Sequence, residues 1–363
     1  MLIALLLALA ITMGIRTRLA SVRAARLERQ REQLLEDVGL LQTALLPKLP
    51  ERLGPVATSA AYRPAAGPGA GGDFYDVFAL EDGRIAIILG DVSGHGREAL
   101  PHTALVRFTL RAYLEAGLSP RGAVQTAGDV LERQLGESFA TVVVATYQPR
   151  ERTLVYSCAG HPPPVVLGVG VGTAPTASIT ACSSPPLGVG RRTGTRQTVV
   201  SVPGSARLCF HTDGLTEARV GAELFGERRL ADALAGLGPR ASASELLDRV
   251  AEQVDKRPDD MAACVLSVTG GADAPRVLTE ELELDHEEAS SGRTEGFLLA
   301  CGVPRGDVAD IVREAREAAA RAGKVILRLQ IGDSAPEVTL QHDNLAYLPA
   351  RRSSRQAAVG VAR

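Results

Sequence analysis

The chain has 363 residues, more than one domain of average size, so a large domain with smaller flanking pieces is expected. Hydrophobic residues make up 45% and charged residues 23%, a composition that argues against a disordered chain. The formal net charge is -2, and because binding to a phosphate backbone needs a basic excess, no nucleic acid partner is expected. The five cysteines contain no CxxC pair, so neither a disulfide framework nor a zinc site is expected.

Residues 1–15 are apolar apart from Thr12 and Gly14, and arginines recur directly after them, from Arg16 to Arg31. A complete membrane span needs about 17–25 residues, so this segment is short for one. Because the basic residues lie C-terminal to the apolar run, the positive-inside rule predicts a single-pass anchor in the cell membrane, with the rest of the chain in the cytoplasm. A hydrophobic leader with no membrane role is the alternative.

Residues 16–49 are predicted to form a helical stalk that stops at Pro47, because proline cannot continue a helix. Apolar residues recur there with the spacing of a coiled-coil seam, at Leu27, Leu34, Val38, Leu41 and Leu45. This seam indicates a parallel homodimer. The alternative is one amphipathic helix packed on its own domain, since the seam is short and Arg31 falls on it.

Residues 50–270 are predicted to form one α+β domain, in which short β-rich runs alternate with helical stretches. Strand pairs without a helix between them, as in residues 142–157, favour antiparallel hairpins over a doubly wound parallel sheet. After Gly270, an acidic stretch, a helix and two strands indicate a small α/β appendix of unknown role over residues 276–350. Residues 351–363 are predicted to be a disordered tail.

Four acidic motifs follow one another through the central domain, at strand ends or in glycine-rich turns: Gly71–Asp76, Gly90–Gly96, His211–Glu217 and Pro258–Met261. Each alone has a structural interpretation, because Asp-Gly is a common turn and paired aspartates can cap a strand. Together they suit a hard metal, since carboxylates bind Mg²⁺ or Mn²⁺ and small neighbours let backbone carbonyls approach the ion. The gathered carboxylates would repel one another unless two cations, about 3.5–4 Å apart, neutralised them and activated water.

The order and spacing of these motifs resemble the PPM metal-dependent protein phosphatases, in the SpoIIE/RsbU branch that acts on phosphorylated anti-anti-sigma factors. The resemblance runs from about Leu41 to Val268 and includes further matches at Tyr62–Ala65, Phe139–Thr141, Ala159–Pro162, Pro186–Gly188 and Phe225–Arg228. It implies a β-sandwich flanked by helices, with the metals at one end of the sandwich. The implied activity is that of a Mn- or Mg-dependent protein serine/threonine phosphatase, in which metal-bound water attacks the phosphoryl group.

The resemblance also assigns site residues by their positions. The metal ligands would be the carboxylates of Asp73, Asp91, Asp213 and Asp259, with Asp260 as second choice for the last, and the backbone carbonyl of Val92. Asp91 and Asp213 are expected to be central to catalysis. The implied cofactors are two Mn²⁺ or Mg²⁺ ions, and the implied substrate is a phosphorylated anti-anti-sigma (STAS) protein.

Two histidines and three rival interpretations accompany this assignment. His95 lies two positions beyond the proton-donating histidine of the related eukaryotic enzymes, so it is either the general acid or a loop brace. His161 is expected to support its own loop rather than to touch substrate. A docking scaffold of the same fold without activity is the main alternative. A diguanylate cyclase is disfavoured because Phe74 follows Gly-Gly-Asp, and an ATPase-type kinase because the appendix lacks the motifs that hold ATP.

Overall fold

The structure is a computed structural model that describes residues 46–64, 72–94, 99–168, 184–190, 192–238, 241–255, 259–270, 278–332, 336–342 and 348–349, with scattered positions between Met13 and Arg29. Those scattered positions are helical and exposed. The apolar leader apart from Met13, most of the predicted stalk, His95 and the predicted tail lie outside the described residues. Within the described part, no helix combines the length and apolarity needed to cross a membrane.

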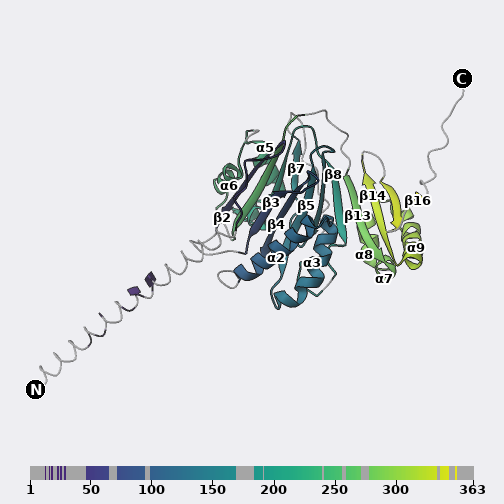
Figure 1. The fold of residues 1–363 in the computed structure, drawn as a ribbon, viewed down its shortest axis with the longest axis horizontal. Helices are drawn as coiled ribbons and strands as arrows, with labels where there is room; N and C mark the ends of the chain where they lie inside the picture. Colours follow the sequence, from purple (N-terminus) through teal and green to yellow (C-terminus); the bar gives the residue numbers. More distant parts are fainter. Residues whose placement is uncertain are drawn as a thin grey trace, which may run out of the picture.

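Two antiparallel sheets form the body of the molecule (Figure 1). The smaller sheet has the order β1 (Arg52–Leu53), β2 (Val56–Arg63), β12 (Met261–Val268), β9 (Ala206–His211) and β7 (Val165–Gly168). The larger sheet has the order β16 (Leu348–Pro349), β15 (Glu337–His342), β14 (Lys324–Ile331), β13 (Leu278–Asp285), β8 (Arg196–Ser201), β6 (Thr153–Ala159), β5 (Ala140–Gln148), β4 (Ile85–Val92) and β3 (Phe74–Ala79). The hairpin preference of the sequence is therefore confirmed.

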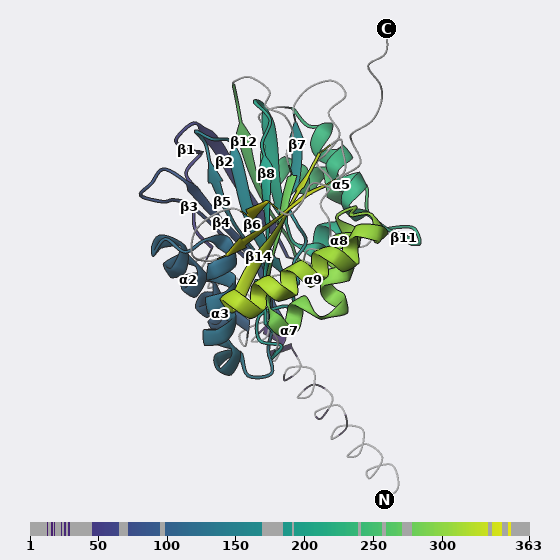
Figure 2. The same cartoon turned by 90° about the vertical axis from the view of Figure 1, so that its right-hand side faces the viewer.

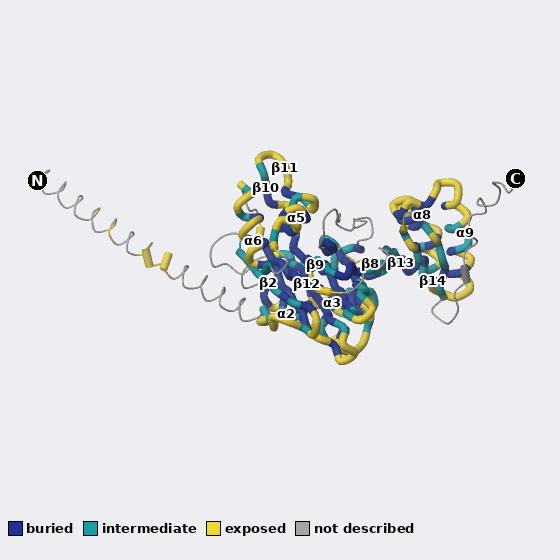
Figure 3. The backbone as a smooth tube through the Cα atoms, turned by 90° about the horizontal axis from the view of Figure 1, so that it is seen from above, coloured by how far each residue is buried: buried dark blue, intermediate teal, exposed yellow. Residues whose placement is uncertain are grey.

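Side-chain alternation along the strands builds a layered core. On the larger sheet, Tyr75 and Leu89 face inward and pack with residues of the smaller sheet such as Phe210. Their neighbours Phe74 and Ile88 face outward and pack under helices α2 (Ala99–Glu115) and α3 (Pro120–Leu135). Helices α5 (Gly226–Ala235) and α6 (Ala243–Ala251) cover the outer face of the smaller sheet. The sandwich flanked by helices is present, and Figure 3 shows its buried strands in dark blue.

The flanking helices begin where their sequences provide caps. Ser119 caps α3 by accepting from the Gly122 amide, and Pro120 follows at the start of the helix, where no backbone donor is needed. Ser242 and Glu245 form a reciprocal capping box at the start of α6. Local sequence thus fixes where these covering helices begin.

Residues 278–342 form a C-terminal unit with its own hydrophobic core. Its helices are α7 (His286–Ala289), α8 (Gly292–Ala300) and α9 (Arg305–Ala322), and its strands are β13, β14 and β15. Strand β13 pairs with β14 on one side and with β8 on the other. The larger sheet therefore runs without interruption from the sandwich into the C-terminal unit, and Figure 1 shows β8, β13 and β14 side by side. In Figure 2 helix α9 of this unit faces the viewer.

The acidic stretch after residue 278 is buried at this junction. Glu281 accepts from Arg328 at 2.8 Å and Gln197 at 3.1 Å, and it lies 3.5 Å from Arg121 of α3. Glu283 pairs with Lys324 at 2.8 Å. We call the five charged side chains among them, Arg121, Glu281, Glu283, Lys324 and Arg328, the β13 charge network. Burial would raise the pKa of Glu283, but the hydrogen bond and charge of Lys324 outweigh it and lower that pKa.

Candidate metal centre

Five predicted aspartates lie at one end of the sandwich. Asp73 directly precedes β3, and Asp91 lies near the end of β4, which runs antiparallel to β3. Asp213 follows β9 as the first residue of helix α4 (Asp213–Thr216). Asp259 and Asp260 precede β12, whose first residues pair with the end of β9. Two strand ends from each sheet therefore bring these carboxylates to the same end of the sandwich.

Two glycines allow the loops to approach each other. A Cβ atom on Gly72 would overlap the Val92 carbonyl and the Asp91 carboxylate, well inside the 3.0 Å that real Cβ atoms keep. A Cβ atom on Gly214 would overlap the backbone carbonyl of Asp260 in the same way. Packing therefore explains why a glycine stands beside Asp73 and beside Asp213: at both positions the backbone lies directly against another backbone segment, which leaves no room for a side chain.

Replacing Gly72 with alanine should therefore disrupt the centre. The new methyl group would force the Val92 and Asp91 loop away, at a cost of about 1–3 kcal/mol in the free energy of unfolding, with loss of metal-dependent activity. The control is Gly296→Ala in α8, where no atom lies within 4 Å of the added methyl group. Thermal unfolding and phosphate release measure both effects. Equal behaviour of the two variants would contradict the close packing.

The carboxylates influence one another strongly. Burial, followed by the charge of Asp91, raises the pKa of Asp73 well above its usual value. Burial, followed by the charges of Asp213 and Asp259, raises the pKa of Asp91 to about 7. Burial also raises the pKa of Asp213, assisted by the nearby charges of Glu217 and Asp259. These carboxylates repel one another when all are ionised, and divalent cations would neutralise that repulsion. Because Mg²⁺ and Mn²⁺ prefer oxygen ligands, the residues fit such ions.

The described side chains do not form a complete metal-coordination site. Among the residues that the structure describes, no three histidine, cysteine or acidic side chains are grouped closely enough to hold a metal ion. In addition to burial, the charges of Asp91 and Asp213 nevertheless raise the pKa of Asp73, and that of Asp213 raises the pKa of Asp91. The ligand set therefore stays a prediction, supported by that coupling and by the packing of the two glycines.

Two hydrogen-bonding partners of the carboxylates were not predicted. The Thr212 hydroxyl donates to Asp73 Oδ2 at 3.0 Å and accepts from the Ala262 amide at 2.9 Å. The Tyr62 hydroxyl donates to Asp260 Oδ2 at 2.6 Å. Both lie inside motifs that the sequence singles out, but nothing in the sequence indicates which carboxylate each would bind. They orient Asp73 and Asp260.

The choice between Asp259 and Asp260 as last ligand stays open. Asp259 is exposed, and its Oδ1 accepts from the Asp260 amide at 2.8 Å. Asp260 is partly buried and bonded to Tyr62. In addition to burial, the charges of both aspartates raise the pKa of Asp91. The Val92 side chain packs under the helices, which leaves only its backbone carbonyl available to an ion.

His161 joins the two sheets behind the centre. Its Nε2 donates to the His211 carbonyl at 3.2 Å, because a carbonyl can only accept, and its Nδ1 then accepts from the Thr141 hydroxyl at 2.9 Å. Burial lowers the pKa of His161 to about 3 and that of His211 to about 4. His161 is thus a neutral brace for its loop, as predicted.

Acid should destabilise the fold through these histidines. The pKa of His161 is about 3 in the folded chain and about 6.5 in the unfolded chain. As the pH falls from 6.5 toward 3, the unfolded chain therefore takes up a proton that the folded chain does not, and the folded state loses stability. Replacing His161 with glutamine should make the free energy of unfolding about 1.4 kcal/mol per pH unit less steep between about pH 6 and pH 4. Urea denaturation across that range measures the slope. Identical slopes for the two proteins would contradict the assignment.

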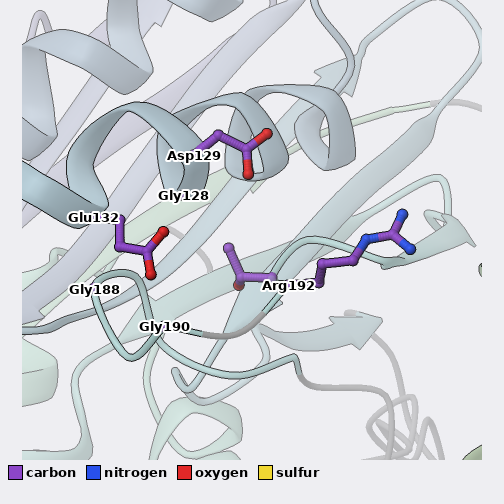
Figure 4. Close-up of a pocket in the computed structure, with 7 residues that line it drawn as sticks. Gly128, Asp129, Glu132, Gly188, Gly190 and Arg192 are labelled. Carbon is purple, nitrogen blue, oxygen red and sulfur yellow. The ribbon is translucent and has the colours of Figure 1, made fainter.

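A polar pocket of about 230 Å³ includes none of the five candidate ligand aspartates in its lining (Figure 4). It is lined by Gly128, Asp129, Glu132, Gly188, Gly190, Arg192 and Thr193, between α3 and the loop before β8. The Arg192 guanidinium is occupied by Asp285 at 2.6 Å and Glu288 at 2.8 Å. None of the predicted site residues lines this pocket, so it is not the centre of the expected chemistry.

A family model described as Stage II sporulation protein E (SpoIIE) matches residues 81–269. The chain belongs to the SpoIIE family. Asp91, Asp213, Asp259 and Asp260 lie within the matched SpoIIE region, and Asp73 lies just before it. The resemblance to SpoIIE/RsbU-type PPM phosphatases drawn from the motifs is confirmed.

Known proteins agree with the SpoIIE assignment. The phosphoserine phosphatase RsbP of Bacillus subtilis is 24% identical over 163 residues, which cover 42% of this chain and 38% of RsbP. The chain spans about a third of the length of the curated relatives it matches.

Two solved structures share the fold. The RsbU and RsbW domains of Rv1364c from Mycobacterium tuberculosis are 24% identical with a TM-score of 0.51, covering 78% of this chain and 84% of that one. The SiaA-PP2C domain of Pseudomonas aeruginosa is 21% identical with a TM-score of 0.54, covering 66% and 98%. The SpoIIE-family sandwich is therefore a PPM-type, or PP2C-type, α+β fold.

Proposed function

We propose that the chain is a Mn²⁺- or Mg²⁺-dependent protein serine/threonine phosphatase. Its substrate is a phosphorylated regulatory protein, an anti-anti-sigma factor of the STAS type. The observation that carries this proposal is the convergence of Asp73, Asp91 and Asp213 from both sheets at one end of a SpoIIE-family sandwich, where Gly72 and Gly214 let the loops pack backbone against backbone. When bound, two divalent cations would supply Lewis acidity and activate water at neutral pH.

The residues of the chain have distinct parts in this proposal. Asp91 and Asp213 would hold the cations, and the Val92 carbonyl would add a neutral ligand. Thr212 fixes the orientation of Asp73, and Tyr62 fixes that of Asp260. His161 carries no proton to the reaction, because its ring is buried and both nitrogens are engaged. The serine or threonine oxygen of the substrate leaves, and no covalent phosphoenzyme is needed.

A docking scaffold without activity is the second candidate. It would retain the fold while losing the carboxylates, yet every predicted carboxylate is present. The relative RsbP is a phosphoserine phosphatase, which supports the enzymatic proposal. Rv1364c contains RsbU and RsbW domains together, which supports a regulatory protein as partner.

Phosphate release decides between the two candidates. The full chain is incubated with a serine-phosphorylated anti-anti-sigma protein over a range of Mn²⁺ concentrations. Release should rise with Mn²⁺, stop in EDTA and return when Mn²⁺ is restored. Binding of the phosphoprotein without any release would favour the scaffold, and release unaffected by EDTA would contradict metal dependence.

We also propose that residues 1–15 anchor the chain in the cell membrane with its catalytic part in the cytoplasm, and that residues 16–49 form a parallel dimer. The apolar leader, the arginines behind it and the seam of Leu27 to Leu45 support this. A chain beginning at Arg16 should sediment as a dimer at micromolar concentration, and one beginning at Pro50 as a monomer. Two monomers would refute the dimer, and activity of a periplasmic reporter fused after Arg363 would refute the orientation.

A further inference from the structure

An exposed aromatic ring lies beside the candidate metal centre. Phe139 directly precedes β5, and 41% of its surface is accessible to solvent. Its carbonyl accepts from the Ser93 amide at 2.9 Å, and its amide donates to the Ser93 hydroxyl at 2.9 Å. Ser93 follows Val92 and Asp91. Phe139 is thus held in place by the strand end that presents the predicted ligands.

The strand register indicates which face this ring occupies. Asp91 is the cross-strand partner of Thr141, so their side chains share one face of the larger sheet. The Thr141 hydroxyl bonds His161, whose other nitrogen bonds a carbonyl of the smaller sheet, so this face looks between the sheets. Side chains alternate along a strand, which places Phe139 on the same face as Thr141 and Asp91.

The loop opposite Phe139 presents a position without a side chain. Ala140 and Leu187 form an antiparallel bridge, so Gly188 lies across from Phe139. A Cβ atom on Gly188 would lie 2.8 Å from the Ser138 carbonyl, so this position cannot carry a side chain without a shift. Val189 follows and is 46% exposed. We call Phe139, Gly188 and Val189 the apolar rim.

We propose that the apolar rim receives an apolar side chain next to the phosphoserine of the protein substrate, with Phe139 as the residue that sets this specificity. The inference rests on the proposed phosphatase function. A phosphate that reaches Asp91 brings the flanking chain past Phe139, because Phe139 is bonded to Ser93, two positions from Asp91. The rim itself carries no charge, and the adjacent carboxylates repel an acidic segment, so an apolar neighbour fits best.

The test compares a protein substrate with a small one. For Phe139→Ala, kcat/KM toward a serine-phosphorylated anti-anti-sigma protein should fall roughly tenfold or more, mainly through KM. Hydrolysis of p-nitrophenyl phosphate, which has no flanking chain, should stay within about twofold of wild type. Phe139→Tyr, which keeps the aromatic surface, should restore turnover of the phosphoprotein. The matched control is Phe108→Ala in α2, another phenylalanine that is 51% exposed.

Each outcome bears on the proposal. Equal losses on both substrates would mean that Phe139 merely supports the centre, and equal losses in the Phe108 variant would mean that any exposed apolar residue matters. A change in oligomeric state with unchanged kinetics would assign the rim to a second copy of the chain. Any of these results overturns the inference while leaving the phosphatase intact. Wild-type protein that hydrolyses neither substrate would instead refute the proposed function and this inference with it.

Discussion

Asp213→Asn should lower Mn²⁺-dependent phosphate release by more than about a hundredfold. Residues that only support a metal ligand typically cost about 10–100-fold when replaced, so loss of a ligand should cost more. Asparagine keeps the size of the side chain but removes the negative charge that a cation needs. The measurement is phosphate release from a phosphoserine protein against Mn²⁺ concentration. Near-normal turnover at saturating Mn²⁺ would contradict the role of Asp213.

The same variant should not lose stability in EDTA. Because the folded pKa of Asp213 is raised above 3.8, its ionised form penalises the fold, and the penalty grows as the pH rises through the folded pKa. Asparagine carries no such penalty, so thermal stability without metal should be level with wild type in acid and equal or higher at alkaline pH. Asp232→Asn, an exposed position in α5, is the control and should change neither activity nor stability. A clear loss of stability in Asp213→Asn would make any loss of activity uninformative about metal binding, and Asp91→Asn would then replace it.

Glu281→Gln should reduce the free energy of unfolding by about 3–5 kcal/mol, the usual cost of breaking a buried ion pair. Its side chain is only 4% exposed and lies between Arg328 and Arg121, which are 30% and 13% exposed. Glutamine removes the negative charge that Arg328 and Arg121 share at Glu281, and Arg121 keeps the more distant Glu283, at 3.7 Å. Urea denaturation measures the change, which is large beside a typical domain stability of about 5–15 kcal/mol.

The control for this prediction lies in the same acidic stretch. Glu287 of α7 is exposed, so Glu287→Gln should change stability by no more than about 0.5 kcal/mol. The double replacement of Glu281 and Arg328 by leucine should recover part of the loss, since apolar groups of similar volume need no counter-charge. Equal effects of Glu281→Gln and Glu287→Gln would show that the β13 charge network contributes little.

The positions of the candidate ligands could be predicted because their signals are local. Asp91 and Asp213 each lie within a few residues of an apolar strand and a glycine. Gly214, which must be a glycine because it packs against backbone, directly follows Asp213. The partners of these groups could not be predicted. Tyr62 meets Asp260 across 198 residues of sequence, and Thr212 meets Asp73 across 139. Such pairings depend on how strands of different segments come together, which no local pattern records.

The C-terminal unit illustrates the same limit. Its helix and two strands were predicted within residues 276–350, and the structure contains α9, β14 and β15 there. Where the first strand, β13, lies, the sequence indicates only an acidic stretch, because Glu280, Glu281 and Glu283 are poor strand residues. The partners of these side chains are distant in sequence: Thr198 lies 82 residues before Glu280, and Arg121 lies 160 residues before Glu281. Burial of these acids depends on that long-range match.

The uninterrupted sheet has a practical consequence for anyone who trims this protein. A fragment that stops near residue 270, where the family match ends, would remove β13 and leave β8 at an open edge. In the full chain, residues 278–282 of β13 pair with residues 196–200 of β8. In the fragment, the backbone of Arg196, Gln197 and Thr198 would lose this strand partner and face water. Bare strand edges recruit other strands, so the isolated phosphatase-like region should precipitate or pair edge to edge where the full chain stays dispersed.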